Sequence, residues 1–144
     1  MITRLDNVGV VVRDLPAVRD FFVALGFRVD GETFVEGEWV DRVLGMSGVR
    51  SDIAVLQAPD GSRLELVAYT SPDVVDPGEV PLQTLGLRRL CFGVDDLDTT
   101  LTVAREHGAQ LMGEVIDYAD VYRLAYLTGP EGLVLMLAEE RDPG

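Results

Sequence analysis

The sequence VRDL at residues 12–15 decides the fold, because it recurs as VDDL at residues 94–97 and divides the chain into two similar halves. The same offset of 82 (94 minus 12) carries Gly26 onto Gly108. In each half an apolar run precedes the motif, and an amphipathic stretch that ends at the glycine follows it. Glycine commonly follows the last turn of a helix, so each half is predicted to begin as strand, helix, strand. The shared spacing indicates a duplication.

The second part of each half repeats with a different offset. The stretch DGSRLEL at residues 60–66 aligns with EGLVLML at residues 131–137, an offset of 71 (131 minus 60). The first half is therefore longer by 11 residues (82 minus 71), and the surplus lies around residues 36–46, whose composition is typical of a loop or a short helix. An acidic residue followed by glycine predicts a tight turn between two strands. Each half is thus a β-α-β-β-β unit, and the fold class is α+β.

The domain organisation follows from these repeats. We expect one domain over residues 1–144, with module one at 1–69, a linker at 70–85 and module two at 86–140. The linker contains Pro72, Pro77 and Pro81, which favour an extended backbone. A chain of 144 residues with 47% hydrophobic residues is long enough for one ordinary core.

Alternation along the strands separates the two faces of each predicted sheet. The large apolar positions should cover the helix of each module: Val8, Val10, Val12, Leu64 and Leu66 in module one, and Leu90, Phe92, Val94, Leu133, Leu135 and Leu137 in module two. Small or polar residues alternate with them on the opposite face. We therefore expect a mixed sheet shaped as a cup, with the helices on its outer face and a ligand site in the concavity.

Composition excludes several classes of partner. The 25 acidic and 12 basic residues give a net charge of −13, which would repel nucleic acid and anionic membranes. No segment approaches the roughly 20 apolar residues that span a bilayer, and the N-terminus lacks a signal-peptide pattern, so we expect a cytoplasmic protein. The single cysteine, Cys91, excludes an internal disulfide and a multi-cysteine zinc site.

At several places the chain resembles the vicinal-oxygen-chelate superfamily of glyoxalase, bleomycin resistance and dioxygenase-like proteins. The stretches LDNVGVVVRDL at 5–15 and GLRRLCFGVDDLD at 86–98 resemble the opening strands of its two modules. DGSRLELV at 60–67 and GPEGLVLMLAE at 129–139 resemble the closing strands. The resemblance implies the glyoxalase and bleomycin resistance fold, and it implies a homodimer. It does not select an activity, since the superfamily includes glyoxalases, extradiol dioxygenases, epimerases, thiol transferases and metal-free antibiotic-binding proteins.

The resemblance also indicates where a metal would bind in metal-dependent members, at His, Glu or Gln, His, and Glu. The matching positions here are Asn7, Glu65, Arg89 and Met136. Only Glu65 is an anionic ligand, whereas Arg89 has no lone pair to donate and Met136 offers a soft thioether. We therefore expect no metal cofactor. A weak divalent-metal site that uses Glu65, Asn7 and water remains the alternative.

Two of these positions are our candidate catalytic residues. Glu65 and Arg89 should face the same cup, where a carboxylate and a guanidinium can pair. The pair would either close the seam between the modules or anchor a ligand, and both interpretations stay open. Arg63, on the same face as Glu65, would either pair with it or meet an anionic ligand.

Other side chains have weaker assignments. Trp39 would form an aromatic wall for a planar ligand or pack under a loop. Tyr126 completes the predicted ligand-binding set of Asn7, Arg63, Glu65, Arg89, Met136, Trp39 and Tyr126, although the pattern does not show which of Tyr122, Arg123 and Tyr126 points inward. His107 lies before the capping glycine and is interpreted as structural. Cys91 lies on the cup face and is interpreted as a small inert side chain.

Three functions remain in view. The first is a metal-independent binder of a small organic molecule, oriented by Arg89. The second is a lyase or isomerase in which Glu65 acts as a general base and Arg89 stabilises an enolate. The third is a weak divalent-metal-dependent glyoxalase-type enzyme. A dioxygenase iron site would need two histidines, and the chain has one.

Overall fold

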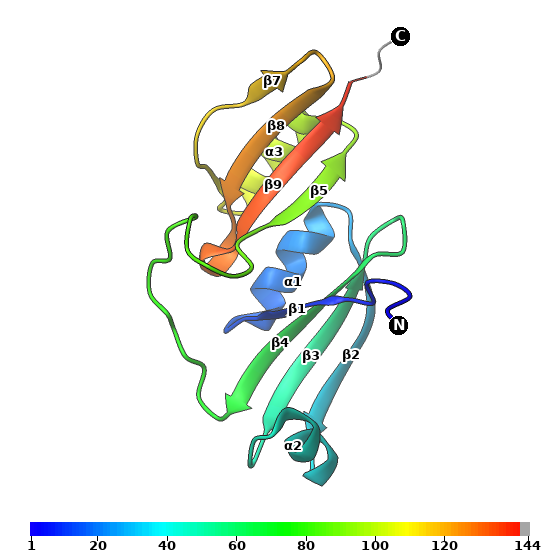
Figure 1. Ribbon diagram of the computed structural model, residues 1–144, viewed down its shortest axis with the longest axis vertical. Coiled ribbons are helices and arrows are strands. Elements are labelled where there is room, and N and C mark those ends of the chain that lie inside the picture. Colours follow the sequence, from blue (N-terminus) through cyan, green and yellow to red (C-terminus); the bar gives the residue numbers. More distant parts are fainter. Residues whose placement is uncertain (142–144) are drawn as a thin grey trace. The chain divides into compact units, whose positions relative to one another are not determined.

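The computed structural model describes residues 1–141, which form two compact units (Figure 1). Unit 1 comprises Met1–Asp76, and unit 2 begins at Pro77. Each unit has its own sheet and its own long helix. The predicted α+β class is confirmed.

Unit 1 has the predicted order of elements, with one short helix added. The elements are β1 (Val8–Val11), α1 (Leu15–Ala24), β2 (Arg28–Glu36), α2 (Glu38–Leu44), β3 (Arg50–Gln57) and β4 (Arg63–Ser71). The strand order in the sheet is β1-β4-β3-β2. β1 runs parallel to β4, and the other two pairs are antiparallel. The helix α2 occupies the surplus segment of the first half, where a loop or a short helix was expected.

Unit 2 repeats this topology. Its elements are β5 (Leu90–Val94), α3 (Leu97–Glu106), β6 (Gln110–Leu111), β7 (Ile116–Tyr118), β8 (Tyr122–Thr128), the 3-10 turn η1 (Pro130–Gly132) and β9 (Val134–Glu140). The strand order is β5-β9-β8-β6, and β7 pairs with β8. As in unit 1, the first strand is parallel to the last one.

The duplication is visible in the backbone at residue level. The offset of 82 carries the first and last residues of α1 onto those of α3. Both helices begin with an aspartate cap: Asp14 accepts a hydrogen bond from the backbone N–H of Ala17, and Asp96 accepts one from Thr99, each at 3.0 Å. Both helices have the expected glycine after them, with positive φ at Gly26 and Gly108. The predicted repeat is therefore confirmed.

Each sheet buries the face that covers its helix. In unit 1, Val18, Phe21 and Phe22 of α1 are buried together with Ala54, Leu56, Leu64 and Leu66 of the sheet. In unit 2, Leu97, Leu101 and Ala104 of α3 are buried with Ala125, Leu127, Leu135 and Leu137. The alternation that the sequence predicted for the first and last strands is confirmed, since the residues between these buried ones are more exposed. Burial of apolar area against the helix is the main stabilising contribution to each unit.

The longest helices of residues 1–141 are α1 and α3, with 10 residues each. Neither they nor α2 combines the length and the apolar character of a segment that crosses a bilayer.

Candidate functional site

The most distinctive side-chain cluster lies in unit 2, on the face of the sheet that points away from α3. Met136 of β9 lies between two neighbours in register, Cys91 of β5 and Tyr126 of β8. Arg89 comes directly before β5, two residues before Cys91, and therefore has the same facing. The sheet thus brings together three of the predicted site residues. Tyr126 lies on β8, Met136 lies on β9, and Arg89 directly precedes β5.

Arg89 is held by two weak contacts. Its Nη1 donates to Sδ of Met136 at 3.2 Å, and its guanidinium carbon lies 5.7 Å from the ring centroid of Tyr126. A separation below about 6 Å is within the range of a cation–π interaction. Among the described residues of unit 2, no carboxylate forms an ion pair with Arg89. The guanidinium is positioned by the sheet, while its charge is left uncompensated within the unit.

The corresponding place in unit 1 has different chemistry. Glu65 of β4 lies in register with Gly9 of β1 and Val55 of β3, and it is half-buried. Within the described unit 1, no side chain donates a hydrogen bond to its carboxylate or forms an ion pair with it. Asn7 does not turn to Glu65, because its Nδ2 donates to Oδ2 of Asp6 at 3.3 Å. The pair between Glu65 and Arg89 would join the two units and stays a prediction.

Asn7 adds to a small charged group at the N-terminus. The pKa of the Asp6 carboxyl is lowered, first by the hydrogen bond and charge of Arg4 and then by the hydrogen bond from Asn7. These side chains are exposed, so the group orders the segment before β1 only weakly.

Arg63 has a partner that the sequence analysis did not name. Its Nη2 lies 3.4 Å from Oδ2 of Asp30, and both side chains are partly exposed. Asp30 sits where the register between β2 and β3 shifts, between Val29 and Gly31. Such a bulge redirects a side chain, and no simple alternation pattern predicts it.

Trp39 lies on the short helix α2 and is 64% exposed. The alternative in which it packs under a loop is therefore wrong. The proposed role as an aromatic wall stays a prediction, since exposure leaves the ring free to contact a ligand.

The facing of β8 is now defined. Ala125 and Leu127 are buried on the helix side, so Tyr126 points to the opposite face together with Met136. Arg123 lies on the same side of β8 as the buried Ala125 and Leu127. Its guanidinium lies 3.2 Å from Asp98, at the beginning of α3, and 3.5 Å from Glu139. The hydrogen bond from Arg123 lowers the pKa of Asp98. Arg123 therefore links the helix to the sheet, and Tyr126 belongs to the candidate site.

His107 lies at the end of α3, where the sequence analysis placed it, and the interpretation of Cys91 as an inert side chain stays a prediction. His107 is the C-terminal cap residue of α3, and its Nδ1 lies 3.0 Å from the carbonyl oxygen of Val103. Cys91 is an exposed free thiol in register with Met136. Neither side chain gathers with other metal-binding groups, because residues 1–141 hold no cluster of three or more His, Cys, Asp or Glu arranged around a common point.

The residues at the family's metal positions in unit 2 do not fit a divalent ion. One position carries a permanent cation and the other a thioether, and the two side chains contact each other. A guanidinium donates hydrogen bonds but has no lone pair for a metal. Hard divalent ions also prefer oxygen ligands to a thioether. The arrangement instead presents N–H donors, which suit an oxyanion.

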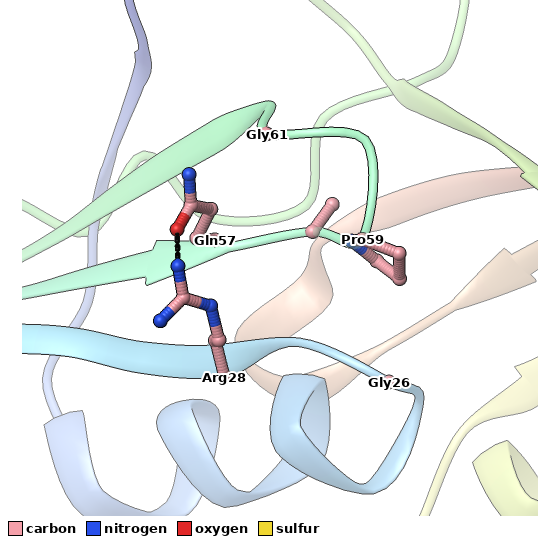
Figure 2. Close-up of a pocket in the computed structure, with 6 residues that line it drawn as sticks. Gly26, Arg28, Gln57, Pro59 and Gly61 are labelled. Atoms are coloured by element: carbon pink, nitrogen blue, oxygen red, sulfur yellow. Dashed lines mark hydrogen bonds between the residues drawn. The ribbon is translucent and has the colours of Figure 1, made fainter.

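A small pocket lies elsewhere, at one end of unit 1 (Figure 2). It has a volume of about 190 Å³ and lies between the end of α1 and the turn that joins β3 to β4, lined by Gly26, Arg28, Gln57, Ala58, Pro59 and Gly61. The sequence analysis did not predict it. Arg28, its only charged side chain, donates to Oε1 of Gln57 across the strand pair and lies 3.9 Å from Asp30. Its charge is therefore already engaged, in contrast to that of Arg89.

Comparison with known proteins supports the resemblance described above. A family model described as the Glyoxalase/Bleomycin resistance protein/Dioxygenase superfamily matches residues 6–126. A glyoxalase family protein from Bacillus cereus is 40% identical, with 99% of this chain and 97% of that chain covered, and its structure gives a TM-score of 0.94. No curated protein matches the sequence.

More distant structures share the fold alone. A glyoxalase family protein from Enterococcus faecalis is 21% identical, over 94% of this chain and 97% of that chain, with a TM-score of 0.66. A fosfomycin resistance protein from Listeria monocytogenes, solved with Mn(II) and sulfate, is 13% identical over 98% and 95%, with a TM-score of 0.63. A shared fold does not select a function, so the function is argued from this chain's own side chains.

Proposed function

Because this chain belongs to the glyoxalase, bleomycin resistance protein and dioxygenase superfamily, we propose that it binds a small organic anion on the helix-free face of the unit 2 sheet, without a metal ion. The single observation that carries the proposal is the guanidinium of Arg89. It contacts Met136 and Tyr126 and has no carboxylate partner among the described residues of its unit.

The chemistry of arginine favours this choice of ligand. A guanidinium presents several N–H donors in one plane and can bind a carboxylate, phosphonate or sulfonate through two parallel hydrogen bonds. The contact with Met136 occupies Nη1 weakly, and the ring of Tyr126 restricts the side chain without neutralising it. Such positioning lowers the entropic cost of ordering the side chain when the anion binds.

The test is a thermal-shift screen in the presence of a chelator, with anionic compounds and their neutral amides compared in pairs. A ligand that binds only the native state raises the unfolding temperature. At a free ligand concentration of about one hundred times Kd, it stabilises the native state by about 2.7 kcal/mol. We expect anions to raise the midpoint of the parent but not that of Arg89→Met. Arg105→Met removes the same charge from the exposed last turn of α3 and should respond as the parent does.

Equal shifts by acids and amides would contradict the proposal, as would a response that Arg89→Met retains. Loss of the response in both Arg89→Met and Arg105→Met would contradict it as well, because the effect would then be one of net charge.

Proton transfer by Glu65 is a second candidate, and one observation favours it. The carboxylate is half-buried, lies in register with Gly9 and Val55, and has no partner within the described unit 1. An unpaired carboxylate on a sheet face can accept a proton from a carbon acid if a ligand is placed beside it. Deuterium exchange at C3 of a 2-oxo acid, the carbon next to the ketone, tests this when it is followed by NMR. Exchange that the parent catalyses and Glu65→Gln does not would support this candidate, whereas no exchange by the parent would contradict it.

The expected homodimer and cytoplasmic location are part of the same proposal. Large apolar side chains are exposed before β1, at Leu5, and in the segment before β5, at Leu85 and Leu87. Exposed apolar groups of this kind favour association of two copies. Light scattering of the purified chain should give twice the mass of one chain, and a monomer at all concentrations would contradict the expectation.

A further inference from the structure

The face that carries Arg89 continues along unit 2 as a strip of aromatic and aliphatic side chains. Tyr118 of β7 lies in register with Tyr122 of β8, and Ile116 lies in register with Leu124. Tyr122 and Leu124 are four and two residues from Tyr126, so all five side chains share one face of the sheet. Tyr118 is 62% exposed and Ile116 is 49% exposed. The short strand β7 therefore adds apolar surface at the far end of the site.

The middle of this strip is a floor of small residues. Gly93 of β5 and Ala138 of β9 are in register, between the row that contains Met136 and the row that contains Glu140. A Cβ atom placed on Gly93 would have only the carbonyl oxygen of Ala138 nearby, at 4.0 Å. The backbone of Gly93 does not have a positive φ, so this glycine is not required by the conformation. Its effect is to leave open space above the sheet.

The far end of the strip carries negative charge. Glu140 lies in register with Tyr122 and is exposed. It is four residues beyond Met136 on the same strand, which corresponds to about 13 Å at roughly 3.3 Å per residue. A ligand that extends from Arg89 over the floor would meet a cation first, then apolar surface, and finally a carboxylate.

From this order we infer that the ligand is an aromatic monoanion: an acidic head binds Arg89, a flat ring lies over Gly93 and Ala138, and Tyr122 and Tyr118 contact the end of the ring. Aromatic rings stack favourably on tyrosine, and a flat ring fits over the small residues Gly93 and Ala138. A second acidic group at the far end would face Glu140 and be repelled. The inference rests on the proposed function, since it names the class of anion that the Arg89 site takes.

Calorimetric titration of the full chain with a matched set of acids tests the inference. The probe is 4-phenylbutyrate, whose ring is separated from its carboxylate by about the distance between two rows of the sheet, roughly 6.6 Å. Butyrate lacks the ring, and 4-(4-carboxyphenyl)butyrate adds a second carboxylate at the far end. We expect 4-phenylbutyrate to bind about tenfold or more tightly than either, since each comparison removes or opposes one contact.

Three variants assign the selectivity to the strip. Gly93→Val fills the space above the floor and should weaken 4-phenylbutyrate about tenfold, by steric exclusion, while leaving butyrate unchanged. Gly113→Val is its matched control: that glycine also lacks a positive φ, has no atom within 4 Å of an added Cβ, and lies outside the strip. Glu140→Gln should bring the diacid closer to the monoacid without changing the affinity for 4-phenylbutyrate.

The outcomes separate this inference from the proposed function. If all three acids bind with equal affinity and all lose affinity in Arg89→Met, the anion site stands and the aromatic monoanion is overturned. The inference is also overturned if Gly93→Val binds 4-phenylbutyrate as tightly as the parent does, provided that the control Gly113→Val is folded and binds it equally well. If no acid of the set binds and the thermal-shift screen finds no Arg89-dependent anion, the proposed function and this inference fail together.

Discussion

The two units have the same backbone and different chemistry on the face that is free of the helix. In unit 1, Gly9 of β1 is in register with Glu65 of β4, and the two offsets carry this pair onto Cys91 and Met136 in unit 2. The residue that precedes each first strand differs as well, with Asn7 in one unit and Arg89 in the other. The fold of each unit is specified by strand pairing and by the buried side chains on the helix side of the sheet. The positions on the other side are therefore free to differ, and they carry an acid, Glu65, in unit 1 and a cation, Arg89, in unit 2.

The helix side also differs between the units, although its burial is the same. Phe22 and Phe27 of unit 1 pack edge to face with a centroid distance of 5.6 Å. The offset of 82 carries them onto Ala104 and Ala109, which are both buried. Unit 1 therefore has large rings at these positions, whereas unit 2 has small side chains there.

Removing a ring from unit 1 should have the largest effect on stability. Phe22→Ala leaves a cavity at a fully buried position and should lower the free energy of unfolding by about 3–5 kcal/mol. The change at the corresponding position of unit 2, Ala104→Gly, removes one methyl group from a helix and should cost about 1 kcal/mol. Urea denaturation followed by circular dichroism measures both. Equal costs would show that the two cores are not as different as their side chains indicate.

The two helix caps should have equal effects of intermediate size. Asp14→Ala and Asp96→Ala each remove one side-chain hydrogen bond to the first turn, at 3.0 Å in both units. Each substitution should cost about 0.5–2 kcal/mol in the same denaturation experiment. Asp14→Asn and Asp96→Asn retain the hydrogen-bond acceptor and should cost less. A cost at one cap only would mean that the duplicated caps are not equivalent.

The ion pairs of unit 2 should give the smallest effect, and one that depends on pH. The hydrogen bond from Arg123 lowers the pKa of Asp98, so the ionised carboxylate is stabilised in the folded state. That stabilisation is fully present above the pKa of an unfolded aspartate, about 3.9, and is lost as the pH falls through the lower folded pKa. Asp98→Asn should therefore lower the urea midpoint slightly at neutral pH and not at all in strong acid.

Asp95→Asn is the control for this change, because Asp95 is exposed and close in sequence. It should have little effect at either pH. A deficit in Asp98→Asn that persists in strong acid would mean that the ion pair with Arg123 is not its cause.

Most of the fold was predictable because it depends on repeated local signals. The alternation of apolar residues, the two aspartate caps and the glycines after the helices all recur at fixed offsets, and each signal has one structural meaning. The strip beyond Arg89 was not predictable, because β7 has only three residues and its pairing with β8 is made through a turn in which Ala119 and Asp120 adopt positive φ without being glycine.

The candidate site was predictable in part. The resemblance directed attention to Arg89 and Met136, and the structure brings them into contact with Tyr126. The facing of β8 was ambiguous in the sequence because Tyr122, Leu124 and Tyr126 alternate with Arg123, whose polar head reaches Asp98 while its stem lies on the buried side. The partner of Arg63 was not predictable, because a bulge places Asp30 beside it.

Titration with Mn(II) or Zn(II) after chelator treatment tests the central claim most directly, which is that Arg89 and Met136 have replaced a metal site by an anion site. The comparison is between the parent and a triple variant that restores the family's ligands, Asn7→His, Arg89→His and Met136→Glu. We expect calorimetry to show no stoichiometric binding by the parent and about one equivalent bound by the triple variant. One equivalent bound by the parent, and lost in Glu65→Gln, would contradict the account.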